Sequence, residues 1–134
     1  INTAGIPDNI MKTLILDIKF NQKYFERVIH HEVFHIIHDS YKDIFDEKVW
    51  SKFNIEAFKY AECSTCTKKV GLDTNLNPNG FITEYSQSTA SEDMAEVFSH
   101  LMYGGFPENV DPILEKKINF IKSNLLKIDK NFLL

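Results

Sequence analysis

The stretch VIHHEVFHIIHDS, residues 28–40, contains four of the five histidines of this 134-residue chain. Apolar residues recur through it and through the preceding turns with the spacing of one helix face, and Asn21 is a suitable N-cap. The pattern therefore predicts a helix over residues 21–40. Its middle, residues 31–35, reads HEVFH and matches the HExxH motif.

The HExxH spacing suits a metal ion because helical residues four apart lie only about 40° apart around the helix axis. His31 and His35 can therefore bind one Zn²⁺ ion, while Glu32 flanks the ion and can take a proton from the attacking water. Random placement of these residue types would give such a match with a frequency on the order of one in a hundred. The motif thus predicts a single catalytic zinc ion rather than a histidine-rich surface helix that matches by coincidence.

Two further histidines accompany the motif. His30 points about 100° away from His31 around the helix, which keeps it from sharing the same ion. His38 lies one turn beyond His35 on the same side, where it can shape a cleft, but we expect it to be an exposed helical histidine. Neither residue is expected to bind the metal.

A catalytic zinc ion takes three protein ligands and leaves its fourth position to water, so one more ligand must come from downstream. The candidates are Glu84, Glu92, Asp93, Glu96 and His100. Glu92 and Glu96 fall in a predicted helix over residues 91–103, SEDMAEVFSHLMY, which ends at a pair of glycines. The two carboxylates share one face of that helix. One can therefore bind the metal while the other accepts the free ring N–H of a ligand histidine.

Glu92 is the favoured ligand, because it lies in the first turn, where a helix opens toward a cleft, and Glu96 is then the outer partner. Acids early in a helix also complement its dipole, and Thr89 with Glu92 can form a capping box. This alternative explains Glu92 well but explains Glu96 poorly, since Glu96 stands among apolar residues. His100 is the rival third ligand and would give a site of three histidines.

The sequence HEVFH, followed by ITEYSQSTASEDMAEVFSHLM, resembles the catalytic domain of anthrax toxin lethal factor and its relatives, which are gluzincin-type zinc metallopeptidases with a zincin-like fold. The resemblance covers roughly residues 25–126 and extends to a broader set of bacterial zinc peptidases. It implies Glu92 as the third zinc ligand and Glu96 as the outer acceptor. It also implies that Tyr85, seven residues before Glu92, hydrogen-bonds the developing oxyanion. A secreted or exported protein is favoured by this resemblance alone.

Two features depart from the pattern of that family. Phe34 stands where relatives usually carry a small residue, and it can narrow the helix packing or fill a neighbouring pocket. The loop over residues 63–80, with Cys63 and Cys66, is additional. Because no second CxxC exists to complete a structural zinc site, we expect either a small disulfide or a free thiol pair.

The remaining sequence predicts further elements of an α+β domain. We expect a turn around Pro7 and Asn9, a strand over residues 13–19 and another short strand over residues 81–85. Helices are expected over residues 46–62 and from Asp111–Pro112 onward, with Asp as N-cap and Pro at the first helical position. The net charge is -4, without a basic stripe or a long apolar run. Neither nucleic acid nor a membrane span is therefore expected.

These observations predict one zincin-like catalytic domain over residues 1–134, with a small sheet on the HExxH helix and a mainly helical C-terminal lobe. Because the chain begins at Ile1 rather than Met, we expect it to be part of a longer precursor. The expected function is a zinc-dependent metalloendopeptidase acting on a protein or peptide substrate. Two alternatives are an inactive zincin-like domain that binds a protein partner, and a helical interaction module with a coincidental motif. The sequence determines neither the oligomeric state nor the cleavage specificity.

Overall fold

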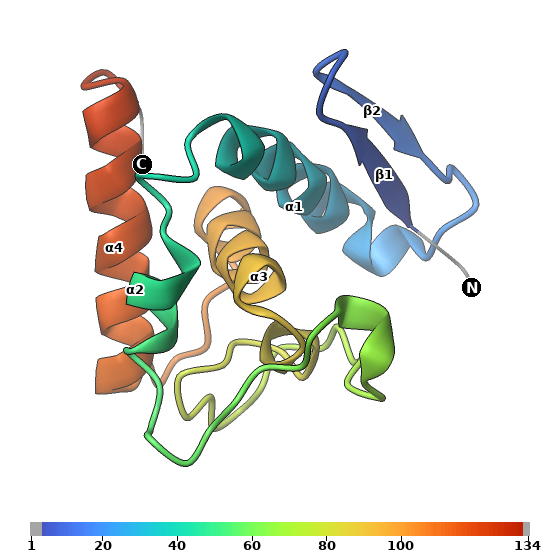
Figure 1. The fold of residues 1–134 in the computed structure, drawn as a ribbon. Coiled ribbons are helices and arrows are strands. Elements are labelled where there is room, and N and C mark those ends of the chain that lie inside the picture. Colours follow the sequence, from blue (N-terminus) through green and yellow to red (C-terminus); the bar gives the residue numbers. More distant parts are fainter. Residues whose placement is uncertain (1–3, 133–134) are drawn as a thin grey trace.

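The computed structural model describes residues 4–132, so both ends of the expected domain, residues 1–3 and 133–134, lie outside the described part. The described elements are β1 (Gly5–Asp8), β2 (Thr13–Leu16), α1 (Gln22–Ser40), α2 (Glu47–Ser51), η1 (Ser64–Cys66), η2 (Tyr85–Gln87), α3 (Ala90–Tyr103) and α4 (Pro112–Ile128). Four α-helices and one two-stranded sheet in this range confirm the α+β class. Figure 1 shows the hairpin on one side of α1, with α3 and then α4 on the other side.

The two strands form an antiparallel hairpin that packs on α1, as expected of a small sheet on the HExxH helix. The predicted strand over residues 13–19 is shorter than expected and ends at Leu16. The expected turn around Pro7 was wrong for that residue, because Pro7 pairs with Leu14 inside β1. The turn begins later, where the Asp8 carboxylate accepts hydrogen bonds from the amides of residues 10 and 11. Proline is tolerated in β1 because this strand pairs on one side only.

The expected strand over residues 81–85 was wrong. Its residues form one isolated bridge, between Thr74 and Thr83, and the chain then enters the short helix η2. The hydroxyls of Thr83 and Ser86 bond each other's backbone amides, at 3.1 Å in both directions. Such local side-chain hydrogen bonds compete with the hydrogen bonds of a strand pair. They explain why the chain enters η2 instead of continuing as a strand.

The predicted helix over residues 21–40 is confirmed by α1, with the Asn21 side chain accepting the Lys23 amide at its start. Its buried face is only partly apolar, because it consists of Arg27, Val28, His31, Phe34 and His38. Phe34 is fully buried against Phe45 and Phe98, with ring centroids 5.2 Å away in both cases. Phe34 therefore fills the core between α1 and α3.

The expected helix over residues 46–62 was wrong beyond Ser51, where α2 ends. Downstream, the rings of Phe58 and Tyr60 lie 4.4 and 6.3 Å from the ring of Phe81. The Tyr60 hydroxyl also donates to the carboxylate of Asp93. These contacts hold residues 58–60 in irregular structure, so tertiary packing outweighs the local helical preference.

The helices α3 and α4 agree with the sequence prediction. Gly104 ends α3 with φ +80°, a left-handed conformation that glycine adopts without strain. The Asp111 side chain caps α4, which starts with Pro112. A buried ion pair joins the two helices, because Lys117 Nζ lies 2.6 Å from the Asp93 carboxylate. This pair fixes the first turn of α3, which carries the candidate metal ligand. Among the helices of residues 4–132, none combines the length and apolar character needed to cross a membrane.

Candidate metal centre

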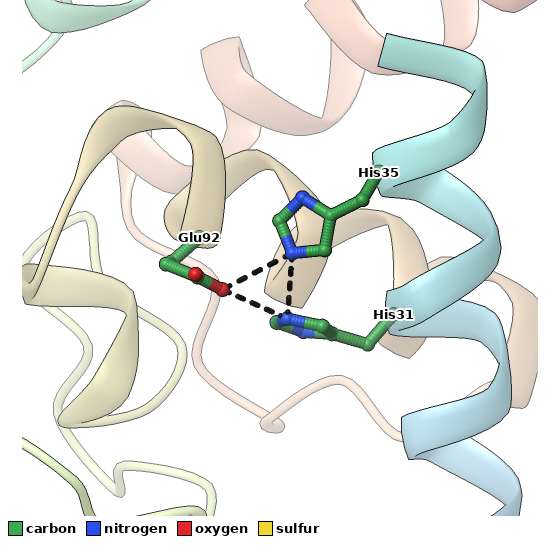
Figure 2. A group of neighbouring side chains, drawn as sticks. All are labelled: His31, His35 and Glu92. Atoms are coloured by element: carbon green, nitrogen blue, oxygen red, sulfur yellow. Dashed lines mark hydrogen bonds and ion pairs between the residues drawn. The ribbon is translucent and has the colours of Figure 1, made fainter. Parts of the chain in front are cut away.

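Three of the expected site residues converge where α1 faces the start of α3. The Nε2 atoms of His31 and His35 lie 3.1 Å apart, and the Glu92 Oε2 atom lies 2.9 and 3.2 Å from them. Figure 2 shows the two imidazoles projecting from α1 toward the Glu92 carboxylate, which comes from α3. Within residues 4–132, this is the only trio of histidine, cysteine or carboxylate side chains whose donor atoms could share one ion.

The donor set fits a zinc ion in both chemistry and spacing. Two histidines and one glutamate are a donor set known from catalytic zinc sites that keep an open position. Around a tetrahedral zinc ion, donors about 2.0–2.1 Å from the metal are about 3.3 Å from one another. The three observed separations of 2.9, 3.1 and 3.2 Å are slightly shorter. Small outward shifts of the side chains would therefore suffice to hold the ion.

The charges around His31 favour a cation at this position. Burial lowers the pKa of His31, but hydrogen bonds and charges from Glu92 and Glu96 outweigh it and raise the pKa to about 10. Burial likewise opposes ionisation of Glu92, yet its bonds to His31 and His35 hold the pKa of Glu92 well below its usual range. The cluster therefore stabilises positive charge, whether that of a proton or that of a metal ion.

Glu96 lies one turn beyond Glu92 and contacts the far side of His31. Its Oε1 atom is 2.8 Å from His31 Nδ1, and its Oε2 atom accepts a hydrogen bond from the Thr83 hydroxyl at 2.8 Å. The Arg27 guanidinium lies 3.8 Å from the same oxygen. Held in this way, Glu96 accepts the Nδ1 proton of His31 and orients the ring so that Nε2, whose proton a bound metal would replace, points toward Glu92 and His35.

Glu32 and Tyr85 line the same cleft, which has a volume of about 940 Å³. Burial raises the pKa of the Glu32 carboxyl, although the adjacent His31 and His35 act against this shift. The Tyr85 ring lies 5.9 Å from the ring of His31, and burial followed by the charge of Glu92 raises the pKa of the phenol. Both groups thus face the cleft beside the histidine pair without belonging to the trio of donors.

His38 is not the exposed residue that we expected. It is buried, with 6% of its surface exposed, and its ring stacks on Phe34. Its Nε2 atom lies 3.1 Å from the backbone oxygen of Phe45. Burial lowers the pKa of His38, which favours the neutral ring. His38 is therefore packed in the interface between α1 and the start of α3.

The other candidate ligands point elsewhere. The Glu84 carboxylate accepts the Gly71 amide, and Asp93 is buried against Lys117. The Nδ1 atom of His100, the rival third ligand, lies 2.8 Å from the backbone oxygen of Glu96, and its Nε2 atom lies 3.1 Å from Arg27. These three residues do not join the donor trio.

Four residues near the site were not identified from the sequence. Arg27 and Thr83 contact Glu96, Ser91 lies between His35 and His38, and the backbone of Gly5 lies against Glu32. Their positions depend on how α1, α3 and the hairpin pack together. Only the burial of Arg27 had a trace in the sequence, since it lies four residues before His31 and thus on the same helix face.

The small α+β fold thus brings together two histidines and one glutamate that could hold a divalent metal ion. Residues 7–129 match the family described as "putative zinc-binding metallo-peptidase", and the chain belongs to that family. Comparison with curated proteins and with solved structures gave no match. Membership supports a metallopeptidase that binds zinc and acts on protein or peptide substrates. The narrower resemblance to lethal factor stays a prediction.

Proposed function

We propose that this chain is a gluzincin-type zinc metalloendopeptidase with a zincin-like fold, in which His31, His35 and Glu92 hold one catalytic ion. The observation that carries the proposal is the convergence of these three side chains in a cleft that Glu32 also lines. A binding-only zinc domain would have no use for a partly buried carboxylate beside the histidine pair. Membership in a zinc metallopeptidase family supports the same reaction class.

When bound, Zn²⁺ supplies Lewis acidity toward the scissile carbonyl and lowers the pKa of water toward neutrality. Glu32 accepts the proton of the attacking water on its carboxylate and passes it to the leaving amine. The raised pKa of Glu32 suits this role, because a carboxylate that must take and return a proton works best when its pKa approaches the operating pH. Glu96 orients the His31 ring by accepting the hydrogen bond from the Nδ1 atom of His31.

Tyr85 is the proposed donor to the oxyanion that forms on the former carbonyl. Its phenol stays protonated at neutral pH, since burial and the charge of Glu92 raise its pKa. A neutral O–H directed at the developing negative charge stabilises the transition state without adding a competing charge to the site. The cleft, with a volume of about 940 Å³, is large enough to admit part of a peptide beside these groups.

Two measurements test this proposal. The first is the zinc content of protein purified without added metal, compared between the parent and the variants His31→Ala and His35→Ala. We expect bound zinc in the parent and little in either variant, because each loses a donor atom. Equal zinc content in all three proteins would refute the metal centre.

The second measurement is cleavage of a degenerate peptide library by the parent and by Glu32→Gln. We expect cleavage by the parent and a loss of roughly 10²–10⁴-fold in the variant, the range ascribed to general acid–base catalysis. Cleavage that survives in Glu32→Gln would contradict the assigned mechanism. A parent that binds zinc but cleaves nothing would instead favour the inactive zincin-like binding domain.

A further inference from the structure

The second ligand histidine has an outer partner of its own, different from the carboxylate that serves His31. The Nδ1 atom of His35 lies 3.3 Å from the Ser91 hydroxyl. The same hydroxyl lies 3.2 Å from Nδ1 of His38, and the other ring nitrogen of His38 lies 3.1 Å from the Phe45 backbone oxygen. These contacts form one continuous line from the metal cluster to the backbone of the segment after α1.

The backbone oxygen at the far end sets the direction of every hydrogen bond in this line. A carbonyl can only accept, so the proton of His38 stands on Nε2. A buried, neutral imidazole then offers a lone pair on Nδ1, to which the Ser91 hydroxyl donates its single proton. The Ser91 oxygen is thereby left to accept from His35, which requires the proton of His35 on Nδ1.

The resulting tautomer of His35 is the one that metal binding needs. With its proton on Nδ1, the ring presents the lone pair of Nε2 toward Glu92 and His31. We propose that Ser91 and His38 form a positioning chain that sets the tautomer and the ring orientation of His35. The proposal rests on the proposed function, since it assumes that His35 is a ligand.

The position of Ser91 beside Glu92 links two parts of the site. The first turn of α3 supplies a metal donor and the hydroxyl that orients another donor on α1. His38 lies on the buried face of α1. Its stacking on Phe34 holds its Nδ1 atom in position to accept the proton of the Ser91 hydroxyl. The two ligand histidines are thus oriented by different groups. The ionised carboxylate of Glu96 orients His31, and the uncharged Ser91–His38 pair orients His35.

The expected effect is smaller than that of removing the carboxylate partner. Losing an outer partner of a ligand histidine typically weakens metal binding 10–100-fold, and a neutral hydroxyl belongs at the lower end. We therefore expect Ser91→Ala to weaken zinc binding about tenfold. His38→Phe keeps the stacking on Phe34 but removes the acceptor, and its effect should be several-fold smaller.

The experiment measures the zinc Kd by chelator competition for the parent, Ser91→Ala, Ser91→Thr, His38→Phe and the double variant Ser91→Ala/His38→Phe. Ser91→Thr retains a hydroxyl and should bind like the parent. The double variant should bind no more weakly than Ser91→Ala alone, because His38 acts through the hydroxyl. Ser99→Ala, the same change elsewhere on α3, is the matched control and should leave Kd unchanged.

A spectroscopic measurement separates positioning from a general loss of stability. In ¹⁵N-labelled protein, the Nδ1 proton of His35 should be observed in the parent and in Ser91→Thr, and should exchange faster in Ser91→Ala. Circular dichroism should show the same helix content throughout. Additive effects of the two substitutions, or a parent-like Kd for Ser91→Ala, would overturn the positioning chain. Failure of the parent to bind zinc would refute the proposed function instead.

Discussion

Gly5 gives the sharpest test of how the hairpin shapes the proposed catalytic site. A Cβ atom added at this position in β1 would lie 2.7 Å from Glu32 Cγ, 3.3 Å from Glu32 Cδ and 3.2 Å from Leu16 Cδ2. Carbon atoms pack best at about 3.5–4.0 Å, so the Glu32 side chain would have to move by roughly 1 Å. The substitution Gly5→Ala therefore displaces the proposed general base without touching a metal donor.

The size of the effect follows from the sensitivity of catalysis to position. A misplacement of about 1 Å can cost on the order of 10²-fold in rate. We therefore expect kcat/KM for a cleavable peptide to fall about 100-fold in Gly5→Ala, equivalent to about 2.7 kcal/mol of transition-state stabilisation. The zinc Kd should stay unchanged, because His31, His35 and Glu92 keep their positions.

The assay compares peptide cleavage and zinc affinity in the parent, Gly5→Ala and Gly105→Ala. Gly105→Ala is the matched control, because its added Cβ would meet Tyr103 at 3.1 Å and Gly105 does not line the cleft. Parent-like cleavage by Gly5→Ala would refute the argument that the hairpin backbone positions Glu32. A parallel loss of zinc affinity would refute it too, since the damage would then extend beyond the general base.

Three further predictions concern the outer partners and the stability of the domain. Glu92→Ala should remove most of the zinc affinity, whereas Glu96→Gln should lower it about 10–100-fold; chelator competition would show the reverse order if the two carboxylates had exchanged roles. Burial, with Arg27 next in importance, lowers the pKa of His100 from 6.5 to about 4. The unfolded chain therefore binds a proton on His100 more readily than the folded state does. As the pH falls below about 6.5, the free energy of unfolding decreases. Between pH 7 and pH 5 the free energy of unfolding should drop by about 2 kcal/mol through this group; urea unfolding of His100→Gln should lack that part of the decrease. The disulfide between residues 63 and 66 closes a very short loop. Replacing both cysteines by serine should therefore lower the free energy of unfolding in urea by about 2 kcal/mol, an effect that a reductant should reproduce in the parent.

The local sequence was enough to predict the elements that carry the proposed chemistry. The four-residue spacing of His31 and His35 gives one face on any α-helix, and α1 has that geometry. Thr89 caps α3, which places Glu92 in its first turn as the sequence indicated. These predictions succeeded because helical periodicity and capping are properties of a few neighbouring residues.

Predictions failed where distant segments decided the outcome. Residues 52–62 did not continue α2, because their aromatic rings pack on Phe81 and Tyr60 bonds Asp93. His38 was expected at the surface but is buried where α1 meets the start of α3. Neither result follows from local propensity, since both depend on which side chains another element brings within reach.

The sequence by itself therefore determined the helices α1, α3 and α4, the donor types and the pairing of a histidine motif with a downstream glutamate. Only the tertiary structure decided that Glu92, rather than Asp93 or His100, faces the histidine pair. It alone placed Ser91 between two histidines and Gly5 against Glu32. The physical reason is that helical spacing fixes directions around one axis, whereas contacts between α1, α3 and the hairpin depend on how the shared core packs.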